Sequence, residues 1–283
     1  MLPQPILVIG ATGMLGRAVV EALRARGVQH SLAGRERVDL ARQETLSAGV
    51  PDGTGAVINC SGWTNVDLAE SNEAEATQIN GHGVGALAER CRQIGAVLVH
   101  YSTDYVFSGD ATAPYAVDQP RAPLNAYGRS KALGEELLEA SGACGGRHLL
   151  IRTSWVYAPW GKNFVRTILG AAQKRPALRV VNDQRGRPSS AEQLAENSLR
   201  LLEAGGLGTF HLSDAGQCTW FDFASRAIAR AGLTCQVDPC SSAEYPSPAR
   251  RPSYSVLDLS RAEALIGPCR SWQDSLDAVV PRL

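Results

Sequence analysis

The chain has 283 residues, of which 44% are hydrophobic, so it is long enough to bury a full core. Its 28 basic residues equal its 28 acidic residues, and this balance argues against binding to nucleic acid or to a membrane surface through bulk charge. We expect one large domain with a smaller annex.

Targeting and redox features favour a cytoplasmic protein. The first ten residues lack the basic region of a secretion signal, and no apolar run reaches the roughly 20 residues that cross a bilayer. The seven cysteines include no C-x-x-C pair, which is typical of reduced thiols. Cys235 and Cys240 could pair or hold a metal, but no histidine or second close cysteine completes a ligand set, so we expect no metal site.

Short apolar runs alternate with amphipathic stretches along the first half of the chain. The pattern predicts strands at Ile6–Ile9, Ser31–Ala33, Gly55–Asn59, Ala96–Tyr101 and Leu149–Thr153. It predicts helices over Met14–Arg26, near Ala69–Ile94 and over Ala126–Ser141. Because short, almost continuously apolar strands separated by helices suit a parallel sheet covered on both faces, we predict a doubly wound α/β fold.

A glycine-rich turn follows the first predicted strand and leads into the first helix. Glycines spaced G-x-x-G-x-x-G permit a tight turn and close approach of the backbone to a pyrophosphate, and the helix N-terminus offers free N–H groups. No G-K-[ST] follows, so the turn is not a kinase-type P-loop. The residues that we expect to bind a dinucleotide here are Gly10, Thr12, Gly13, Met14, Leu15 and Gly16.

The end of the second strand bears on which dinucleotide is bound. An acidic residue usually binds the adenosine ribose there, but this chain offers Arg35. A guanidinium suits a 2′-phosphate, and a charge-assisted hydrogen bond of ~1.5 to 3 kcal/mol corresponds to a roughly ten- to hundredfold preference for NADP over NAD. Arg35 could equally be a solvated loop residue, so NADH stays an alternative to NADPH. Asp39 and the adjoining Leu40 are candidates for contact with the adenine.

The predicted helix over Ala126–Ser141 begins with a candidate proton relay. Tyr127 and Lys131 are four residues apart and therefore share one face of that helix. A free phenol has a pKa of about 10, and bringing it to about 7 takes roughly 4 kcal/mol, which a lysine ammonium one turn away can help to supply. Such a pair alone also occurs on solvated helices, so the pair indicates a catalytic site only together with the glycine turn and the hydroxyl described next.

Hydroxyl groups follow the strand predicted at Ala96–Tyr101. Doubly wound folds bind ligands at the carboxyl ends of their strands, and a hydroxyl placed there can hold a ketone oxygen. We predict that Thr103 is this hydroxyl, with Ser102 as the alternative if the register of the strand differs by one residue.

Beyond about residue 155, prolines and glycines interrupt shorter elements. We therefore predict a dinucleotide-binding domain over residues 1–154, rejoined by about 189–216. A smaller mixed substrate-binding domain would be formed by residues 155–188 and 217–283.

Five blocks of sequence complete the set of motifs, and they are Ser102–Gly109, Tyr127–Glu135, Arg152–Tyr157, Asn182–Pro188 and Arg251–Ser255. Together with the glycine turn they resemble the extended short-chain dehydrogenase/reductases, and within them the dTDP-4-dehydrorhamnose reductase family, over nearly the whole chain. The resemblance implies hydride transfer from NADPH to the C4 ketone of dTDP-4-dehydro-β-L-rhamnose, which gives dTDP-L-rhamnose.

The resemblance also assigns roles to single side chains. It makes Thr103, Tyr127 and Lys131 the catalytic groups. The substrate-site candidates that it implies are Asp104, Tyr105 and Trp155, and more weakly Asn163, Asp183, Gln184 and Arg251. The remaining cofactor contacts that it implies, beside Tyr127 and Lys131, are Cys60, Ser61, Gly62 and Asn80.

Assembly and alternatives complete these expectations. Some relatives are magnesium-bridged dimers, but Ala18 stands where we would expect one glutamate ligand, so no metal is carried over. A homodimer is the association that helices on such folds support. Two other functions stay open: a reductase of another nucleotide-linked 4-keto-deoxysugar, and a non-catalytic NADP-binding regulatory subunit.

Overall fold

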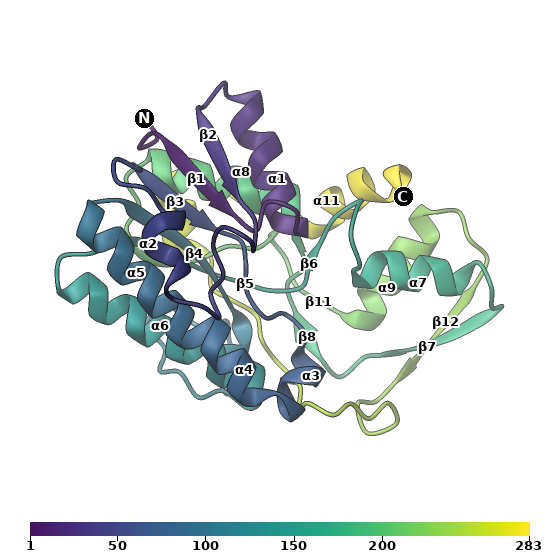
Figure 1. The fold of residues 1–283 in the computed structure, drawn as a ribbon. Coiled ribbons are helices and arrows are strands. Elements are labelled where there is room, and N and C mark those ends of the chain that lie inside the picture. Colours follow the sequence, from purple (N-terminus) through teal and green to yellow (C-terminus); the bar gives the residue numbers. More distant parts are fainter.

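A sheet of parallel strands forms the centre of the molecule in the computed structural model, which describes residues 1–283 (Figure 1). The six strands lie in the order β10 (Gly208–His211), β5 (Arg147–Thr153), β4 (Val97–Thr103), β3 (Ala56–Asn59), β1 (Ile6–Ile9) and β2 (His30–Ala33). Every neighbouring pair is parallel. The chain moves outward from β1 to β2 and then returns to β3, so the direction of winding reverses between β1 and β3. The predicted doubly wound fold is confirmed.

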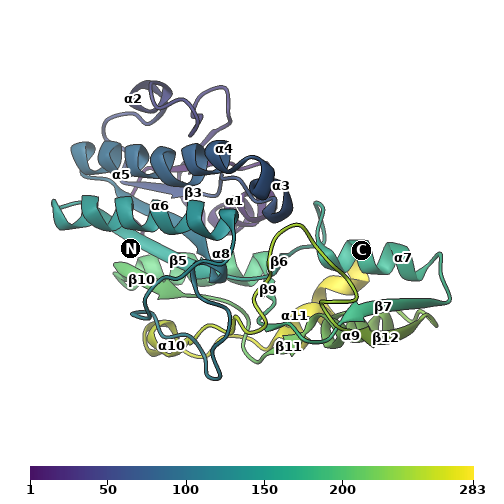
Figure 2. The same ribbon diagram turned by 90° about the horizontal axis from the view of Figure 1, so that it is seen from below.

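Helices cover both faces of this sheet (Figure 2). On one face lie α5 (Gly83–Ile94) and α6 (Ala126–Ala143), with α2 (Thr45–Gly49) at the side; on the other lie α1 (Met14–Ala25), α8 (Ala191–Glu203) and α10 (Ser260–Ile266). The strands are buried on both faces because their side chains alternate. Ile6 and Val8 of β1 enter the core beneath α1 and α8, whereas Leu7 and Ile9 enter the core beneath α5.

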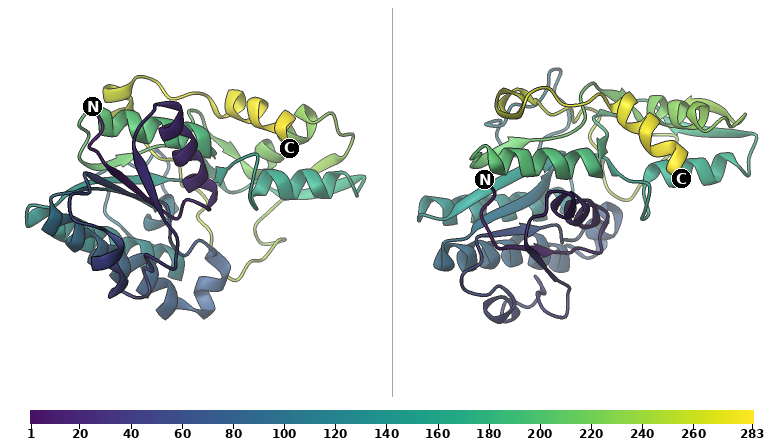
Figure 3. Two further views of the ribbon diagram at one scale, coloured as in Figure 1. Left: turned by 45° about the horizontal axis from the view of Figure 1, so that its top comes forward. Right: turned by 90° about the horizontal axis from the view of Figure 1, so that it is seen from above.

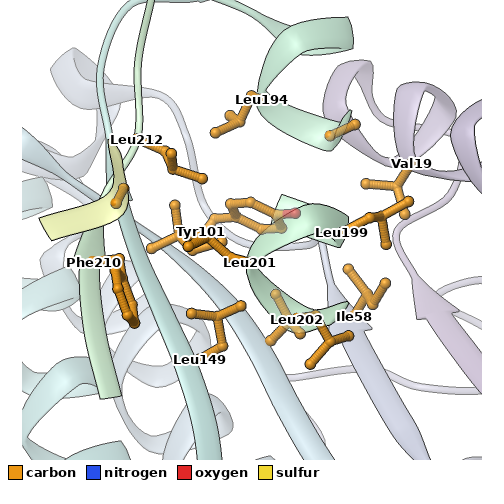
Figure 4. Close-up of a cluster of buried hydrophobic side chains, with 14 of the residues drawn as sticks. Val19, Ile58, Tyr101, Leu149, Leu194, Leu199, Leu201, Leu202, Phe210 and Leu212 are labelled. Carbon is orange, nitrogen blue, oxygen red and sulfur yellow. The ribbon is translucent and has the colours of Figure 1, made fainter. Parts of the chain in front are cut away.

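The core under α8 also fixes the direction of one important strand. Tyr101 of β4 lies among leucines of α8, with Leu149 and Phe210 from the adjacent strands (Figure 4). Because side chains alternate along a strand, His100 and Ser102 must point toward α6, on the opposite face of the sheet. The predicted strand was two residues short at its carboxyl end, since β4 continues to Thr103.

The helix predicted near Ala69–Ile94 is interrupted in the structure. It consists of α3 (Val66–Ser71), α4 (Glu73–Thr77), a π-helical turn over Gln78–His82, and α5. The buried Asn80 side chain explains the π turn. Its Oδ1 accepts from the Trp63 backbone N–H at 2.9 Å, and its Nδ2 donates to the Ser130 hydroxyl at 3.0 Å. The local widening of the helix thus serves a tertiary contact, which hydrophobic periodicity does not reveal.

A smaller lobe stands beside the carboxyl edge of the sheet (Figure 3). Its helices are α7 (Phe164–Ala172), α9 (Trp220–Arg230) and α11 (Trp272–Val279). Its strands are β6 (Val156–Tyr157), β7 (Ala177–Val181), β8 (Arg185–Gly186), β11 (Cys218–Thr219) and β12 (Gln236–Cys240). The strand β9 (Ser189–Ser190), at the start of the segment that returns to the main sheet, pairs with β6. One 3-10 turn over Val280–Arg282 follows α11, and another over Asp104–Val106 follows β4 in the larger domain. A separate hydrophobic cluster around Phe223 and Leu276 forms its core.

We propose the division into residues 1–154 with 189–216, and residues 155–188 with 217–283. The position of α8 and β10 on the main sheet supports it. One segment departs from a strict division, because Leu257, Leu259 and Ile266 belong to the core of the larger domain. None of the helices is long and apolar enough to cross a membrane, and all seven cysteines are free, including Cys235 and Cys240.

A buried ion pair joins α6 to β5. The Arg152 guanidinium donates to both carboxylate oxygens of Glu135, at 2.7 Å from Nη2 and 3.0 Å from Nε, and the side chains are 3% and 0% exposed. Arg152 also donates to the carbonyl of Val117 at 2.8 Å, and Arg121 adds a second guanidinium at 3.2 Å from Glu135. Because each buried charge has partners, the attraction between them offsets the cost of removing the charges from water. Removal of one partner would leave an uncompensated charge in the core.

We expect Glu135→Gln to destabilise the protein by roughly 3 to 5 kcal/mol, since it leaves the Arg152 charge buried without its carboxylate. Urea unfolding followed by circular dichroism measures this loss. Glu136→Gln is the matched control, because Glu136 is 56% exposed and lies 3.8 Å from Arg121, and an exposed pair contributes about 0 to 1 kcal/mol. Equal losses in the two variants would contradict the importance of the buried pair.

Candidate active site

The carboxyl ends of the central strands bring the predicted site residues to one edge of the sheet. Ile9 pairs with Asn59, which pairs with His100 of β4, and the next strand brings Thr153 opposite Thr103. The glycine turn after β1, residues 60–62 after β3 and the hydroxyl of Thr103 therefore lie along the same edge. This is the edge at which doubly wound folds bind their ligands.

The glycine turn has the shape that a pyrophosphate requires. A side chain at Gly16 would lie 2.1 Å from the carbonyl oxygen of Gly10, and one at Gly10 would lie 2.9 Å from the backbone nitrogen of Ser61. Gly10 also has a φ of 74°, in the left-handed region. The helix α1 begins after Gly13 without a side-chain cap and without an acidic residue in its first turn. Its first N–H groups are thus free for an anion, which fits a dinucleotide.

Two arginines, Arg35 and Arg42, follow β2, where the sequence predicts the adenosine of a dinucleotide. The carboxylate of Asp39 accepts from Arg35 Nε at 3.4 Å, from Arg42 Nε at 3.1 Å and from the backbone N–H of Ala41 at 3.0 Å. Burial alone would raise the pKa of Asp39, but the Ala41 N–H and the two guanidinium groups lower it. Leu40 is buried in the core beneath. Asp39 thus holds two largely exposed guanidinium groups at the predicted position of a 2′-phosphate. No sequence motif identifies Arg42.

The loop after β3 is tied to α6 through Asn80. The Nδ2 group of Asn80 donates to the Trp63 carbonyl and to the Ser130 hydroxyl, so both of its N–H groups are used. A side chain at Gly62 would lie 2.9 Å from Asn80 Oδ1, which accepts from the Trp63 N–H. Ser61 donates its hydroxyl to Asn59 at 2.7 Å. The structure therefore gives Asn80 a clear role in placing this loop, while contact of Cys60, Ser61, Gly62 and Asn80 with a cofactor stays a prediction.

Tyr127 lies in the first turn of α6, and local contacts fix that turn. The Asn125 side chain caps the helix by accepting from the Gly128 N–H at 2.8 Å, and Glu70 accepts from the Ala126 N–H at the same distance. The ring of Tyr127 meets that of Tyr105 edge to face, with 5.9 Å between centroids.

The pKa of Tyr127 is raised, opposite to the sequence-based expectation. Burial is the main cause, and the nearby Asp104 and Tyr105 add to it, while a hydrogen bond with the Thr103 side chain opposes it. The ammonium of Lys131 bonds to the Tyr101 carbonyl and not to the phenol, which explains the difference. Burial likewise raises the pKa of Asp104 to about 6, and its Oδ1 accepts from the Thr103 hydroxyl at 3.0 Å. The phenol of the protein alone is thus held firmly in its protonated form.

Lys131 is buried one turn behind Tyr127. Its Nζ donates to the Tyr101 carbonyl at 2.6 Å and lies 3.3 Å from His100 Nε2. Burial lowers the pKa of Lys131 to about 8, although the Glu135 carboxylate opposes the shift. Burial and the Lys131 charge also hold the pKa of His100 well below its usual value. The sequence places His100 in a strand and indicates nothing more, because an isolated histidine in an apolar run gives no signal of its partner.

Tyr105 and Arg251, both predicted at the substrate site, are brought together. Arg251 donates to the Tyr105 hydroxyl at 3.3 Å and to the Asp67 carboxylate at 2.9 Å, although Asp67 and Arg251 are distant in sequence. Trp155 stacks on Trp220, with 3.5 Å between ring centroids. Neither Asp67 nor Trp220 was predicted, since no local pattern connects them to their partners.

Three further substrate-site candidates form hydrogen bonds within the smaller lobe. Asn163 caps α7 by accepting from the Arg166 N–H at 3.2 Å, and its amide donates to the Ala158 carbonyl at 2.9 Å. Asp183 accepts from the Ser242 hydroxyl at 2.6 Å. Gln184 donates to that same hydroxyl at 2.9 Å. Direct contact of these side chains with a substrate stays a prediction.

Comparison with known proteins bears out the resemblance. Residues 4–283 match the family profile described as the RmlD substrate binding domain. A dTDP-4-dehydrorhamnose reductase of Burkholderia thailandensis is 41% identical in an alignment 270 residues long, and the match covers 89% of this chain and 89% of that protein. A dTDP-4-keto-6-deoxy-D-glucose reductase of Streptomyces niveus is 38% identical and covers 98% of this chain and 96% of its own length.

A solved structure of a relative carries the expected type of cofactor. The crystal structure of dTDP-4-dehydrorhamnose reductase from Bacillus anthracis in complex with NADP superposes with a TM-score of 0.92. The two chains are 31% identical, and the match covers 100% of both.

We expect Gly16→Ala to weaken NADPH binding roughly ten- to a hundredfold, because a methyl group forced against the Gly10 carbonyl must displace the turn, at a cost of about 1 to 3 kcal/mol. Isothermal titration calorimetry measures the Kd. The matched control is Gly170→Ala in α7, where a new methyl group would meet no atom within 4 Å. If Gly16→Ala bound NADPH as tightly as Gly170→Ala, the glycine turn would not be the pyrophosphate site.

Proposed function

The chain belongs to the RmlD substrate binding domain family, and from that premise we propose that it is an NADPH-dependent reductase of a nucleotide-linked ketosugar, with Thr103, Tyr127 and Lys131 as its catalytic groups. The substrate that we favour is dTDP-4-dehydro-β-L-rhamnose, and the product is dTDP-L-rhamnose.

One juxtaposition carries the proposal. A strand-end hydroxyl, a partly buried phenol and a buried amine lie at the edge of the sheet that also carries the glycine turn: Thr103 ends β4, while Tyr127 and Lys131 share one face of α6. The raised pKa of Tyr127 keeps its proton in place at neutral pH, which suits a group that donates a proton during reduction. An intact set of this kind also argues against a purely regulatory subunit.

Each side chain has a distinct task in this mechanism. The nicotinamide, when bound, supplies the hydride to C4 of the sugar. Tyr127 donates its phenolic proton to the ketone oxygen as the O–H bond breaks, and the phenolate is then reprotonated from solvent. Thr103 turns its hydroxyl from Asp104 toward the same oxygen and stabilises the charge that develops there. Lys131 holds the cofactor ribose and, while charged, stabilises the phenolate.

The residues that would hold NADPH follow the edge of the sheet. The N-terminus of α1 and the turn from Gly10 to Gly16 would take the pyrophosphate, and Arg35 with Arg42 would take the 2′-phosphate. Asp39 keeps both guanidinium groups at this position without occupying all of their donors. We therefore propose a preference for NADPH over NADH.

A second substrate is supported by one of the relatives. The Streptomyces niveus protein is named a reductase of dTDP-4-keto-6-deoxy-D-glucose, and its identity to this chain is close to that of the Burkholderia protein. The alternative is therefore another dTDP-linked 4-keto-6-deoxysugar, reduced by the same relay. A spectrophotometric comparison of the two ketosugars at equal concentration separates them.

Location and assembly complete the proposal. We propose a cytoplasmic enzyme, and the seven free cysteines support a reducing compartment. Nucleic acid and membranes are not among the proposed partners, as the equal numbers of acidic and basic residues indicate. A homodimer remains a prediction, while the proposed catalytic groups all come from one chain.

We expect Tyr127→Phe to lower kcat by roughly 10² to 10⁴, the usual contribution of a positioned proton donor, while the Kd for NADPH changes little. Stopped-flow absorbance at the NADPH band measures the rate. Tyr245→Phe serves as the control, because Tyr245 is 66% exposed and lies outside the proposed machinery. A Tyr127→Phe enzyme that reduces the ketone at the native rate would remove the phenol from the mechanism.

We expect Arg35→Ala to raise the KM for NADPH roughly ten- to a hundredfold, as for the loss of a charge-assisted hydrogen bond, and to leave the KM for NADH unchanged. Steady-state kinetics with both cofactors measure the two values. Arg24→Ala, an exposed arginine in the last turn of α1, controls for the loss of one positive charge. An equal rise for NADPH and NADH would show that Arg35 does not recognise the 2′-phosphate.

A further inference from the structure

Trp155 has a backbone conformation that a bulky side chain rarely adopts. Its φ is 47°, in the left-handed region, and no other non-glycine residue of the chain has a positive φ. It lies two residues beyond Thr153, which pairs with Thr103 at the carboxyl end of the sheet. Such strain persists only where surrounding contacts impose it, and it concentrates at functional sites.

Trp220 provides the main contact that holds this conformation. The two indole rings are stacked, with 3.5 Å between their centroids and 12° between their planes. The backbone at Gly186 also approaches closely, because a side chain there would come within 2.7 Å of the Trp155 ring. The orientation of the Trp155 indole is therefore set by residues outside its own segment.

A line of hydrogen bonds holds Trp220 in turn. Its Nε1 donates to Gln184 Oε1 at 3.2 Å, and Gln184 Nε2 donates to the Ser242 hydroxyl at 2.9 Å. That hydroxyl donates to Asp183 at 2.6 Å. Phe164 packs against the same indole at 4.6 Å between centroids. The block Asn182–Pro188 thus acts on Trp155 through Gln184 and Gly186.

The indole N–H of Trp155 is left without an acceptor. The indoles of Trp160 and Trp220 donate to protein oxygens, whereas that of the half-buried Trp155 has no partner in the protein and is not enclosed. A rigid donor of this kind, two residues beyond the strand partner of Thr103, can bind a ligand oxygen without further ordering.

We infer that Trp220 and Gln184 are positioning residues for the nucleotide sugar: they hold the Trp155 indole so that its N–H donates to a hydroxyl or phosphoryl oxygen of that ligand. The inference rests on the proposed function for the identity of the ligand. Because an indole nitrogen only donates, the ligand must supply the acceptor. Neither Trp220 nor Gln184 touches the reacting atoms, so they should affect substrate binding rather than the chemical step.

Substitution of Trp220 tests this role in the full-length enzyme. We expect Trp220→Leu to raise the KM for dTDP-4-dehydrorhamnose and the Kd for dTDP-L-rhamnose roughly five- to tenfold, as for the loss of a close aromatic pair, with kcat and the KM for NADPH within about twofold. Trp220→Phe keeps an aromatic face and should restore most of the binding. Gln184→Leu should raise both values roughly threefold, as for one lost hydrogen bond.

A second tryptophan of the same lobe provides the matched control. Trp272 is buried beside Phe223, at 5.8 Å between centroids, and its ring does not meet Trp155. Trp272→Phe should loosen the lobe and leave the KM for the sugar unchanged. An equal rise in Trp272→Phe and Trp220→Leu, or no rise in Trp220→Leu, would overturn the inference.

Calorimetry with dTDP-L-rhamnose separates this inference from the proposed function. If the native enzyme does not oxidise NADPH with any ketosugar but binds dTDP-L-rhamnose in a manner that depends on Trp220, the function is wrong and the positioning role stands. If the native enzyme turns over normally and Trp220→Leu binds dTDP-L-rhamnose as the native enzyme does, the function stands and the positioning role is wrong. Absence of any binding to the native protein would overturn both.

Discussion

The buried ion pair between Glu135 and Arg152 fixes the geometry on which the site depends. Glu135 lies one turn beyond Lys131 and two turns beyond Tyr127, so all three share one face of α6. Arg152 pairs in the sheet with Ser102, next to Thr103. The ion pair therefore sets both the rotation of α6 and its height above the sheet, and in this way it places the phenol and the amine opposite the strand-end hydroxyl.

Burial gives these groups their chemical character. The pKa of Tyr127 is raised and that of Lys131 is lowered to about 8, in both cases because burial disfavours the charged form. The protein alone thus holds a protonated phenol and an amine close to its titration point near neutral pH. The phenol therefore holds the proton that it donates, whereas the amine can gain or lose a proton near neutral pH. The amine also contacts His100, whose buried imidazole is held neutral because its pKa is well below the usual value.

Local patterns were sufficient to predict much of the fold. The apolar runs located the first five strands of the sheet, and the spacing of Tyr127 and Lys131 placed them on one helical face because both patterns depend only on neighbouring residues. The glycine turn was found for the same reason. The family resemblance then supplied the candidates for substrate and further cofactor contacts, which no local spacing predicts.

The remaining features depend on contacts between distant segments. The π turn at Asn80 exists because that side chain bonds to Ser130, and Arg251 reaches Asp67 only after the C-terminal segment crosses the edge of the sheet. The stack of Trp155 on Trp220 likewise joins two segments of the smaller lobe, and no local sequence pattern predicts that they meet. The prediction of a lowered pKa for Tyr127 was wrong because a spacing of four residues does not determine the direction of the lysine side chain. Lys131 donates to the Tyr101 carbonyl.

Transfer of deuterium from stereospecifically labelled NADPH to the sugar tests most directly whether Thr103, Tyr127 and Lys131 converge beside the nicotinamide. The native enzyme would be incubated with dTDP-4-dehydrorhamnose and either C4-deuterated epimer of NADPH, and the product examined by NMR. We expect one epimer alone to deliver deuterium to C4 of the sugar, in proportion to the NADPH oxidised. Oxidation of NADPH without deuterium at that carbon, or no oxidation with this ketosugar or its 4-keto relatives, would contradict the proposed site.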